Sequence, residues 1–436
     1  MHSTRRRLTR RHLLGATAAA GAAGLATGCE PERPASDDAP ALDPASWDSV
    51  RGQFALDRSR AHLATFVFAP HPAPVRAAVA THRAGLDRDA SGYLAANEER
   101  LDRAVLAAAA GHLDARSDHI ALTDSTTMGL GLVYSAIRLR PGDEVLTTEH
   151  DFYATHESLR LRAERDGVTV RRARLYRDAA TAGADEMVAG LTAALTPRTR
   201  VVALTWVHSS TGVKLPVRRL AEAVRERSPE ALLCLDAVHG FGADASTPEQ
   251  LGCDVLISGC HKWLLGPRGT GLVWAAERAW ARMTPVVPTF DGRAIGRWLA
   301  GGTGGAPVPP GPAHTPGGYH SFEHRWALAD AFAFHRSIGP ARVAGRTREL
   351  AGRLKEGLAG IRGVRLVTPR AADLSAGVVC CEVPGVPADE AVGRLWSAGV
   401  VASSTPYRPS YLRFGATIAN GEQDVEAALR AVRTLV

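Results

Sequence analysis

Residues 254–275 read DVLISGCHKWLLGPRGTGLVWA, which is two short apolar runs separated by a glycine-rich turn. The runs at 254–259 and 270–275 have the length and composition of buried strands. Lys262 follows the first run closely, with His261 before it. A lone lysine at such a position normally extends its ammonium group to solvent, so its function depends on the surrounding residues.

Short apolar runs of the same kind recur on the N-terminal side of this stretch, at 119–125, 143–151, 168–176, 200–208 and 231–240. Amphipathic helical patterns separate several of them, for example at 186–195 and 217–224, where apolar residues return on one face. This alternation predicts an α/β fold with a mostly parallel sheet that helices cover on both faces. Ligands of such sheets bind at the carboxyl ends of the strands, so we expect the functional site there.

The C-terminal part of the chain predicts a second, smaller α/β domain. It follows a Gly/Pro-rich segment, 301–318, whose pattern fits a lid and a surface insertion equally well. Helical patterns and strand-like runs then alternate, at 321–339, 341–361, 363–369, 377–385, 387–399 and 411–420. We therefore expect a large domain over 47–320 and a small domain over 321–436.

The composition is that of an ordinary globular protein, with 45% hydrophobic and 22% charged residues among 436. The formal net charge of +7 would fit a nucleic-acid-binding protein, but five arginines lie together in residues 5–12. The other arginines are interspersed with acidic residues along predicted helices, which is typical of a solvated surface. We therefore expect no nucleic-acid partner.

The first 28 residues predict a twin-arginine signal peptide. A basic segment ends in 9-TRRHLLG-15, and an apolar run follows that is too short to span a membrane comfortably. The stretch 25-LATGC-29 resembles a lipoprotein cleavage site with Cys29 as the lipidated residue, and 29–46 has the composition of a disordered tether. We expect an exported, extracytoplasmic protein, membrane-anchored if Cys29 is lipidated; a disordered basic tail is the alternative.

The other five cysteines predict neither a metal site nor a disulfide framework. They form no CxxC pair and show no zinc-ligand spacing, and several lie within strand-like runs. We expect small, buried apolar side chains at Cys234, Cys253, Cys260, Cys380 and Cys381.

Polar residues that could hold a charged ligand follow several predicted strands. Lys262 is a nucleophile only when its amine is unprotonated, which burial or a nearby cation favours. Asp236 ends the apolar run LLCLD. Although such a residue is more often a helix cap, a buried carboxylate needs a partner, and a protonated aromatic nitrogen would be one. His239 could donate a hydrogen bond to the same ligand.

Two further segments predict places for a phosphate and a flat ring. In 119-HIALTDSTTMGLGLVYSAI-137 a strand runs into an apolar helix through Ser125, Thr126 and Thr127. Their hydroxyl groups and free backbone N–H groups suit a phosphate, although a plain helix cap is the default for one such turn. His150 follows another strand with two aromatic residues nearby, and one of these three could stack on a ring.

Taken in order, five strings resemble class V aminotransferase-fold enzymes: STT (125–127), TEH (148–150), DAVH (236–239), HKWLLGPRGTG (261–271) and YLRFGATIAN (411–420). The likeness is nearest to the isopenicillin N epimerase-like branch, which is related to cysteine desulfurases. It implies a pyridoxal-phosphate-dependent transferase of fold type I. Such a protein has a large cofactor-binding domain and a small C-terminal domain, and it forms a homodimer with active sites at the subunit boundary. The implied cofactor is pyridoxal 5′-phosphate, and the expected substrate is an amino acid or small peptide.

The resemblance implies a role for each of the matching positions. Lys262 would hold the cofactor as a Schiff base and later remove the Cα proton, and Asp236 would pair with the pyridine nitrogen. Arg413 would bind the substrate carboxylate, a bidentate task suited to a guanidinium group. The other cofactor contacts would be phosphate contacts from Ser125, Thr126, Thr127 and His261, ring stacking from His150, and contacts near the ring hydroxyl from His239 and Ser209.

Two departures from the family pattern bear on the reaction. Cysteine desulfurases of this class need a nucleophilic cysteine before the carboxylate-binding arginine, and residues 399–414 contain none, so sulfur transfer is disfavoured. The Gly-Thr pair by which many relatives reach the phosphate of the neighbouring subunit is also missing. His320, Ser321 or Arg325 could take its place.

The leading functional hypothesis is an epimerase or aminotransferase acting on an amino acid or short peptide, because both reactions need only proton movement at Cα. A C–S lyase or other β-eliminating lyase acting on a sulfur amino acid is the alternative. A binding protein with degraded catalysis is a third hypothesis, which the complete set of Lys262, Asp236 and Arg413 argues against. The lack of a GxSxG elbow disfavours a hydrolase, and the lack of GxGxxG after a strand disfavours a Rossmann dehydrogenase.

Overall fold

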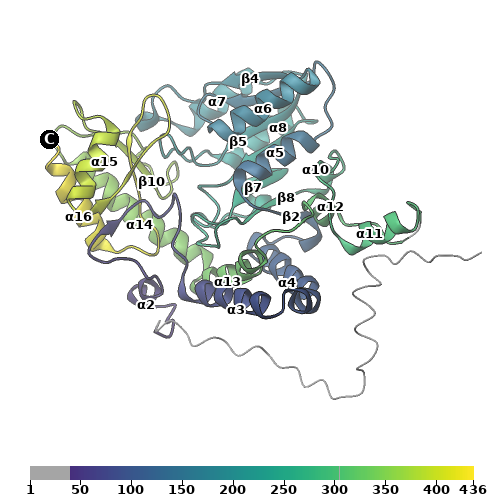
Figure 1. Cartoon of the computed structure of the whole chain (residues 1–436). Coiled ribbons are helices and arrows are strands. Elements are labelled where there is room, and N and C mark those ends of the chain that lie inside the picture. The colour runs from purple at the N-terminus through teal and green to yellow at the C-terminus, as the bar shows by residue number, and fades with distance from the viewer. Residues whose placement is uncertain (1–39, 304) are drawn as a thin grey trace, which may run out of the picture.

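The computed structural model describes residues 40–303 and 305–436, and a seven-stranded sheet forms the centre of the larger part (Figure 1). The strand order is β2-β8-β7-β6-β5-β3-β4. The strands are β2 (Ile120–Thr123), β3 (Glu144–Thr148), β4 (Thr169–Ala173), β5 (Thr199–Thr205), β6 (Leu232–Asp236), β7 (Val255–Gly259) and β8 (Gly271–Ala275). Each overlaps one of the predicted apolar runs, so these strand predictions are confirmed.

The strands β4, β3, β5, β6 and β7 pair in parallel, as predicted, whereas β8 is antiparallel to both β7 and β2. The reason lies in the connection between β7 and β8, residues 260–270, which contains no helix. A parallel return needs a longer crossover, usually a helix, so this short connection returns antiparallel. The same turn carries Lys262 at the carboxyl end of β7.

Helices cover both faces of the sheet, which confirms the α/β class. One face packs against α5 (Thr126–Ala136) and α6 (Tyr153–Asp166). The other face packs against α4 (Ala90–Leu113), α7 (Ala184–Ala194), α8 (Val217–Arg227) and α13 (Phe322–Ile338), and α3 (Ala73–Arg88) lies against α13. In β5, Val201 and Ala203 belong to the first apolar layer and Val202 and Leu204 to the second.

The C-terminal part is built on a smaller sheet with strand order β12-β13-β10-β9 and an apolar cluster of its own. Its elements are β9 (Arg365–Leu366), β10 (Val378–Glu382), β12 (Ser403–Ser404), β13 (Leu412–Gly415), α14 (Pro340–Ala359), α15 (Ala388–Ser397) and α16 (Glu422–Arg433). Near the N-terminal α2 (Trp47–Gly52), β1 (Ala61–His62) pairs in parallel with β11 (Val400–Val401). This N-terminal strand therefore joins the C-terminal elements, and the domain boundary after residue 320 stays a prediction.

Part of the Gly/Pro-rich segment 301–318 packs on the edge of the large sheet. The helix α12 (Pro310–His314) lies against the edge strand β2, where the Ile120 backbone leaves no room for a side chain at Gly311. The Leu122 N–H donates to Thr315 Oγ1 over 3.1 Å. This packing covers a sheet edge that would otherwise be exposed. The preceding helix, α11 (Gly292–Leu299), projects away from the body (Figure 1).

The five described cysteines are buried and free, as predicted: Cys234, Cys253, Cys260, Cys380 and Cys381. Within the described residues, no helix has the length and apolar character needed to cross a membrane. The predicted signal peptide, Cys29 and most of the predicted tether lie outside the residues that the structure describes.

Candidate active site

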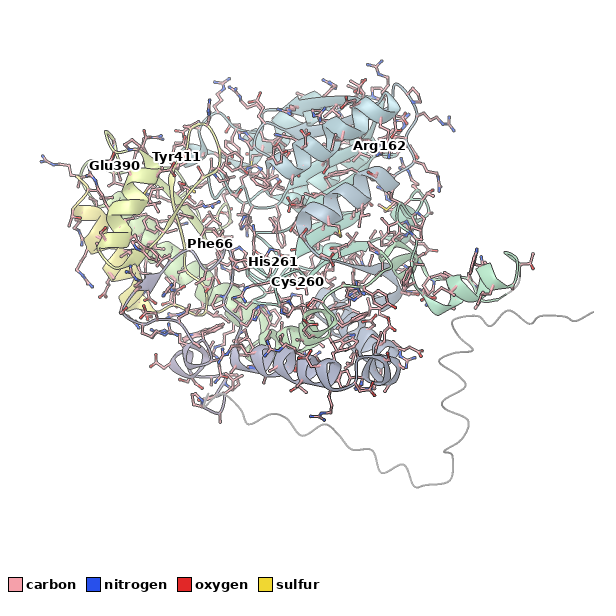
Figure 2. The ribbon with its side chains drawn as sticks, viewed as in Figure 1. Phe66, Arg162, Cys260, His261, Glu390 and Tyr411 are labelled. Atoms are coloured by element: carbon pink, nitrogen blue, oxygen red, sulfur yellow. The ribbon has the colours of Figure 1, made fainter. Side chains whose placement is uncertain are left out.

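The carboxyl ends of β5, β6 and β7 bring the predicted site residues together. Asp236 is the last residue of β6 and lies in register with Thr205, the last residue of β5. After β7 the chain turns back through Cys260, His261 and Lys262. Figure 2 shows His261 and Cys260 near the centre of the molecule, with Phe66 towards the C-terminal elements.

Asp236 is a buried carboxylate with a single hydrogen-bond donor, and the charge of nearby Lys262 offsets its burial only in part. It is 2% exposed and accepts one hydrogen bond, from the Val238 N–H over 3.1 Å. Among the described residues no arginine, lysine or histidine forms an ion pair with it. Burial raises the pKa of Asp236 to about 7. A buried carboxylate is stable as an anion only beside a positive charge, so this position suits a protonated ligand nitrogen.

Lys262 lies beside Asp236 and His239. Its Nζ atom is 3.4 Å from the Nε2 atom of His239. Burial lowers the pKa of Lys262 to about 8; the charge of Asp236 opposes this effect, and that of Arg413 adds to it. About a tenth of the Lys262 side chains are therefore free amines at pH 7, far more than for an exposed lysine, and a nucleophile or a base requires this form.

The start of α5, residues 125–127, is the candidate anion site. Ser125 is the N-cap, and its Oγ accepts a hydrogen bond from the Met128 N–H, while Thr126 Oγ1 accepts from the Gly259 N–H over 2.7 Å. Each hydroxyl therefore keeps its own hydrogen free to donate. A side chain at Gly259 would meet both Thr126 Oγ1 and the His261 ring, so these two groups converge on one point.

Thr127 follows as an exposed residue in the first turn of this helix of 11 residues. The positive end of the helix dipole adds to the attraction for an anion at this position.

His150 follows β3 and is stacked on Tyr176, with ring centroids 3.9 Å apart and an angle of 7° between the planes. The Tyr176 hydroxyl lies 2.9 Å from His208 Nδ1, which holds the tyrosine in place. The Nε2 atom of His150 is buried and has no hydrogen-bond partner among the described residues. The histidine predicted to stack on a ring is therefore itself supported on one face by an aromatic residue.

Arg413 is a buried cation that lacks a carboxylate partner among the described residues. It is 7% exposed and donates from Nη1 to the Ser209 carbonyl and from Nε to Ser403 Oγ, each over 3.1 Å. The Ser209 hydroxyl lies 2.7 Å from the Tyr407 hydroxyl. These contacts orient the guanidinium group and leave it able to bind an anion.

These observations fit pyridoxal 5′-phosphate, the cofactor that the resemblance implies. The phosphate would meet two hydroxyl groups with free hydrogens at a helix N-terminus. The ring nitrogen would meet Asp236, an unpaired buried acid, and the aldehyde would meet Lys262, an amine with a lowered pKa. In the described parts of the chain, no three histidine, cysteine or acidic side chains gather closely enough to hold a metal ion.

Four aromatic residues of the site were not predicted from the sequence. Tyr176 ends a predicted strand and Trp263 follows Lys262, so their positions offered a signal. Tyr407 and Phe66 offered none, because they are remote in the chain from the residues that they contact. Phe66 lies beneath the guanidinium group of Arg413, 5.2 Å from it to the ring centroid.

The residues proposed to reach a neighbouring subunit, His320, Ser321 and Arg325, line a small cavity in their own chain. Asp124 and residues 269–271 line it as well. This cavity adjoins the anion site at Ser125. A contact of these residues with the phosphate of a neighbouring subunit stays a prediction.

Comparisons with known proteins agree with this geometry. A family model described as aminotransferase class V matches residues 103–426. The isopenicillin N epimerase of Amycolatopsis lactamdurans is 28% identical over 418 residues, which cover 89% of this chain and 98% of the relative. A probable cysteine desulfurase of Xylella fastidiosa strain Temecula1 is 27% identical and is matched over 84% of this chain and 87% of its own length.

A solved structure of a cystine C–S lyase in complex with cysteine persulfide has the same fold. Its TM-score is 0.77 at 20% identity, and the match covers 86% of this chain and 98% of that protein.

Proposed function

Because the chain belongs to the aminotransferase class V family and is a pyridoxal-phosphate-dependent enzyme, we propose that it moves the Cα proton of an amino acid or small peptide, as an epimerase or an aminotransferase. The observation that carries this proposal is the free-amine character of Lys262 beside the unpaired carboxylate of Asp236. Arg413 completes the set as the group for the substrate carboxylate.

Each residue of the site would have a separate role in the reaction. The bound cofactor supplies a ring that takes up the electron pair left at Cα. Asp236 would hold a proton on the ring nitrogen, and Ser125 and Thr126 would donate their hydroxyl hydrogens to the phosphate. Arg413 would orient the substrate through its carboxylate, so that the Lys262 amine could remove the Cα proton.

Sulfur transfer through a protein thiol is disfavoured. The connection between β12 and β13 places Tyr407, rather than a cysteine, beside Ser209. The two cysteines of the small sheet, Cys380 and Cys381, are fully buried, and burial raises the pKa of the Cys380 thiol to about 12. A thiol of that kind forms almost no thiolate at neutral pH.

A C–S lyase acting on a sulfur amino acid is the second candidate function. Elimination needs a leaving group on the substrate and no further protein nucleophile, so the same residues would serve. The fold shared with a cystine C–S lyase supports keeping this candidate.

The test is to incubate the holoenzyme with a panel of amino acids and peptides in deuterated water with α-keto acids. Deuterium at Cα with inversion supports epimerisation, and a new amino acid supports transamination. Pyruvate with ammonia or sulfide supports the lyase. If the holoenzyme has no yellow absorbance that borohydride traps at Lys262, the proposal is wrong.

We also propose a homodimer, as the resemblance implies. The projecting α11 and the segment before it expose apolar side chains at Phe290, Ile295, Trp298 and Leu299. Exposed apolar residues gathered in this way are typical of a protein–protein contact. Light scattering should give twice the monomer mass, and Trp298→Glu should lower it. The control Trp396→Glu changes an exposed tryptophan on α15 and should leave the mass unchanged.

For localisation we propose export by the twin-arginine route with lipidation of Cys29, on the sequence of residues 1–29. Cell fractionation should place the protein outside the cytoplasm and in the membrane fraction. Replacing both arginines of the pair by lysine should retain it in the cytoplasm, and Cys29→Ser should release it from the membrane. A cytoplasmic wild-type protein would contradict this proposal.

A further inference from the structure

His239 has one neighbour at each of its ring nitrogens. The Nδ1 atom is 3.1 Å from the indole Nε1 of Trp263, and the Nε2 atom is 3.4 Å from Nζ of Lys262. The residue is 3% exposed, so bulk water does not compete for either position. The protonation of this ring is therefore set by two protein neighbours.

The chemistry of Trp263 decides which nitrogen of His239 carries the proton. An indole N–H can only donate a hydrogen bond, so Nδ1 of His239 must accept and must be unprotonated. A neutral imidazole then carries its proton on Nε2, on the side of Lys262. Burial, with the charges of Lys262 and Arg413, lowers the pKa of His239 well below its usual range, so the ring stays neutral.

The indole itself is held by residues from distant parts of the chain. Phe66 stacks on it with ring centroids 5.4 Å apart and an angle of 26° between the planes. Gly377, just before β10, lies so close to the indole that a side chain there would overlap its six-membered ring. Gly415, the last residue of β13, packs on Phe66 in the same way. The direction of the indole N–H therefore depends on how the C-terminal elements dock.

We propose that Trp263 is a positioning residue that fixes His239 as an Nε2–H donor directed towards Lys262. This N–H can donate to the lone pair of a free amine at Lys262 and faces the hydrogens of an ammonium group unfavourably. It thereby favours the amine over the ammonium form. In the loaded enzyme the ring hydroxyl that the resemblance assigns to His239 would accept the same hydrogen bond, and only this step rests on the proposed function.

Nitrogen NMR of the holoenzyme with ¹⁵N-labelled histidine tests the proton position directly. The signals of His239 are those that disappear in His239→Gln. We expect an unprotonated Nδ1 and a protonated Nε2 in the wild-type enzyme. In Trp263→Phe, which keeps an aromatic ring but removes the N–H, we expect a mixture of both tautomers. Phe66→Leu keeps the N–H, and Gly377 still confines the indole, so the wild-type pattern should persist.

A protonated Nδ1 in the wild-type enzyme would overturn the proposal without any variant. An unchanged pattern in Trp263→Phe would overturn it as well. Both results are independent of turnover, so they remain interpretable if the proposed reaction is wrong.

A double-mutant cycle separates positioning from packing. Trp263→Phe should lower kcat about tenfold, the effect of one hydrogen bond, with KM within about twofold. In the His239→Gln background the same change should cause no further loss, because an amide has no tautomer to fix. An equal loss in both backgrounds would mean that the indole acts only through packing, and it would overturn the proposal.

Discussion

Two buried carboxylates lie at opposite ends of the large sheet and have opposite surroundings. Asp254, at the amino end of β7, accepts hydrogen bonds from Arg278 Nε over 2.6 Å, from Arg278 Nη2 over 2.8 Å and from the Leu233 N–H over 2.8 Å. Asp236, at the carboxyl end of β6, accepts one, from a backbone N–H. Neither residue is more than 2% exposed.

The difference separates a structural charge from a functional one. The partners of Asp254 satisfy both oxygens within the chain, so this residue can stabilise the fold without a ligand. Within the described part of the chain Asp236 forms no ion pair and accepts one hydrogen bond, so its burial has a free-energy cost that a cationic ligand would remove. The same contrast holds for two lysines. Lys355 is buried and donates to three oxygen atoms within 3.1 Å, whereas the partly buried Lys262 has a hydrogen-bond contact only with a histidine among the described residues.

The largest expected effect comes from the unpaired lysine. Lys262→Ala should lower kcat by about a thousandfold to ten-thousandfold, because the base and the covalent attachment are both lost. Steady-state rates with borohydride trapping measure both losses. The matched control Lys355→Met should lower stability and leave the rate of the folded enzyme within about twofold. Equal rates for the two variants would show that the lack of an oxygen partner does not mark Lys262 as the catalytic lysine.

Asp236→Ala should lower kcat by about a hundredfold to a thousandfold, because the protonated ring nitrogen loses its counter-charge. Cofactor content, measured by absorbance, should remain close to that of the wild-type enzyme, since Lys262 and the anion site at α5 are intact. Unaffected turnover would count against the role of this residue.

The cofactor-free protein should show a pH-dependent cost of the unpaired carboxylate. The Asp236 carboxyl has a pKa of about 7 when folded and about 4 when unfolded, so the folded state binds more protons between these values. The stability of the wild type relative to Asp236→Asn should fall as pH rises from about 4 to about 7, on the order of 3 kcal/mol.

Urea unfolding of both proteins at several pH values below 7.5 measures this difference. Adding cofactor should reduce the dependence, because the ring nitrogen then pairs with the carboxylate. If the difference in unfolding free energy between the two cofactor-free proteins does not change with pH, Asp236 is better solvated or paired than this geometry indicates.

Asp254→Ala should lower the free energy of unfolding by about 2–3 kcal/mol, because Arg278, Arg225 and the buried Leu233 N–H lose their acceptor. Urea unfolding measures the loss. The rate of the folded holoenzyme should stay within about twofold, since this residue is at the other end of the sheet. A rate loss as large as that of Asp236→Ala would mean that the number of hydrogen-bond and ion-pair partners does not distinguish a structural carboxylate from a functional one.

The smallest effect is expected at Cys380, which pairs in register with Arg413 in the small sheet. Cys380→Ala should keep kcat within about twofold and cost about 1 kcal/mol of stability through lost packing. The wild-type thiol should resist iodoacetamide under native conditions, because it is buried and protonated. A large loss of activity would reopen sulfur transfer.

Much of the site could be predicted because its residues follow strands. Lys262, Asp236 and His150 each come within a few residues of an apolar run, and Ser125 lies at a strand-to-helix turn. The parallel sheet then places these positions at one edge. Arg413 was reached only through the resemblance, because it is in the small sheet and no local pattern links it to Lys262.

The sequence by itself determined the strands of the large sheet, several of the helices and the chemical groups at the carboxyl edge, because side-chain periodicity is a local property of the chain. Only the tertiary structure decided which groups are left unpaired and what orients them. Trp263 bonds to His239 across 24 positions, and Tyr407 bonds to Ser209 across 198. Such contacts depend on how whole elements pack together, and no local pattern records that packing.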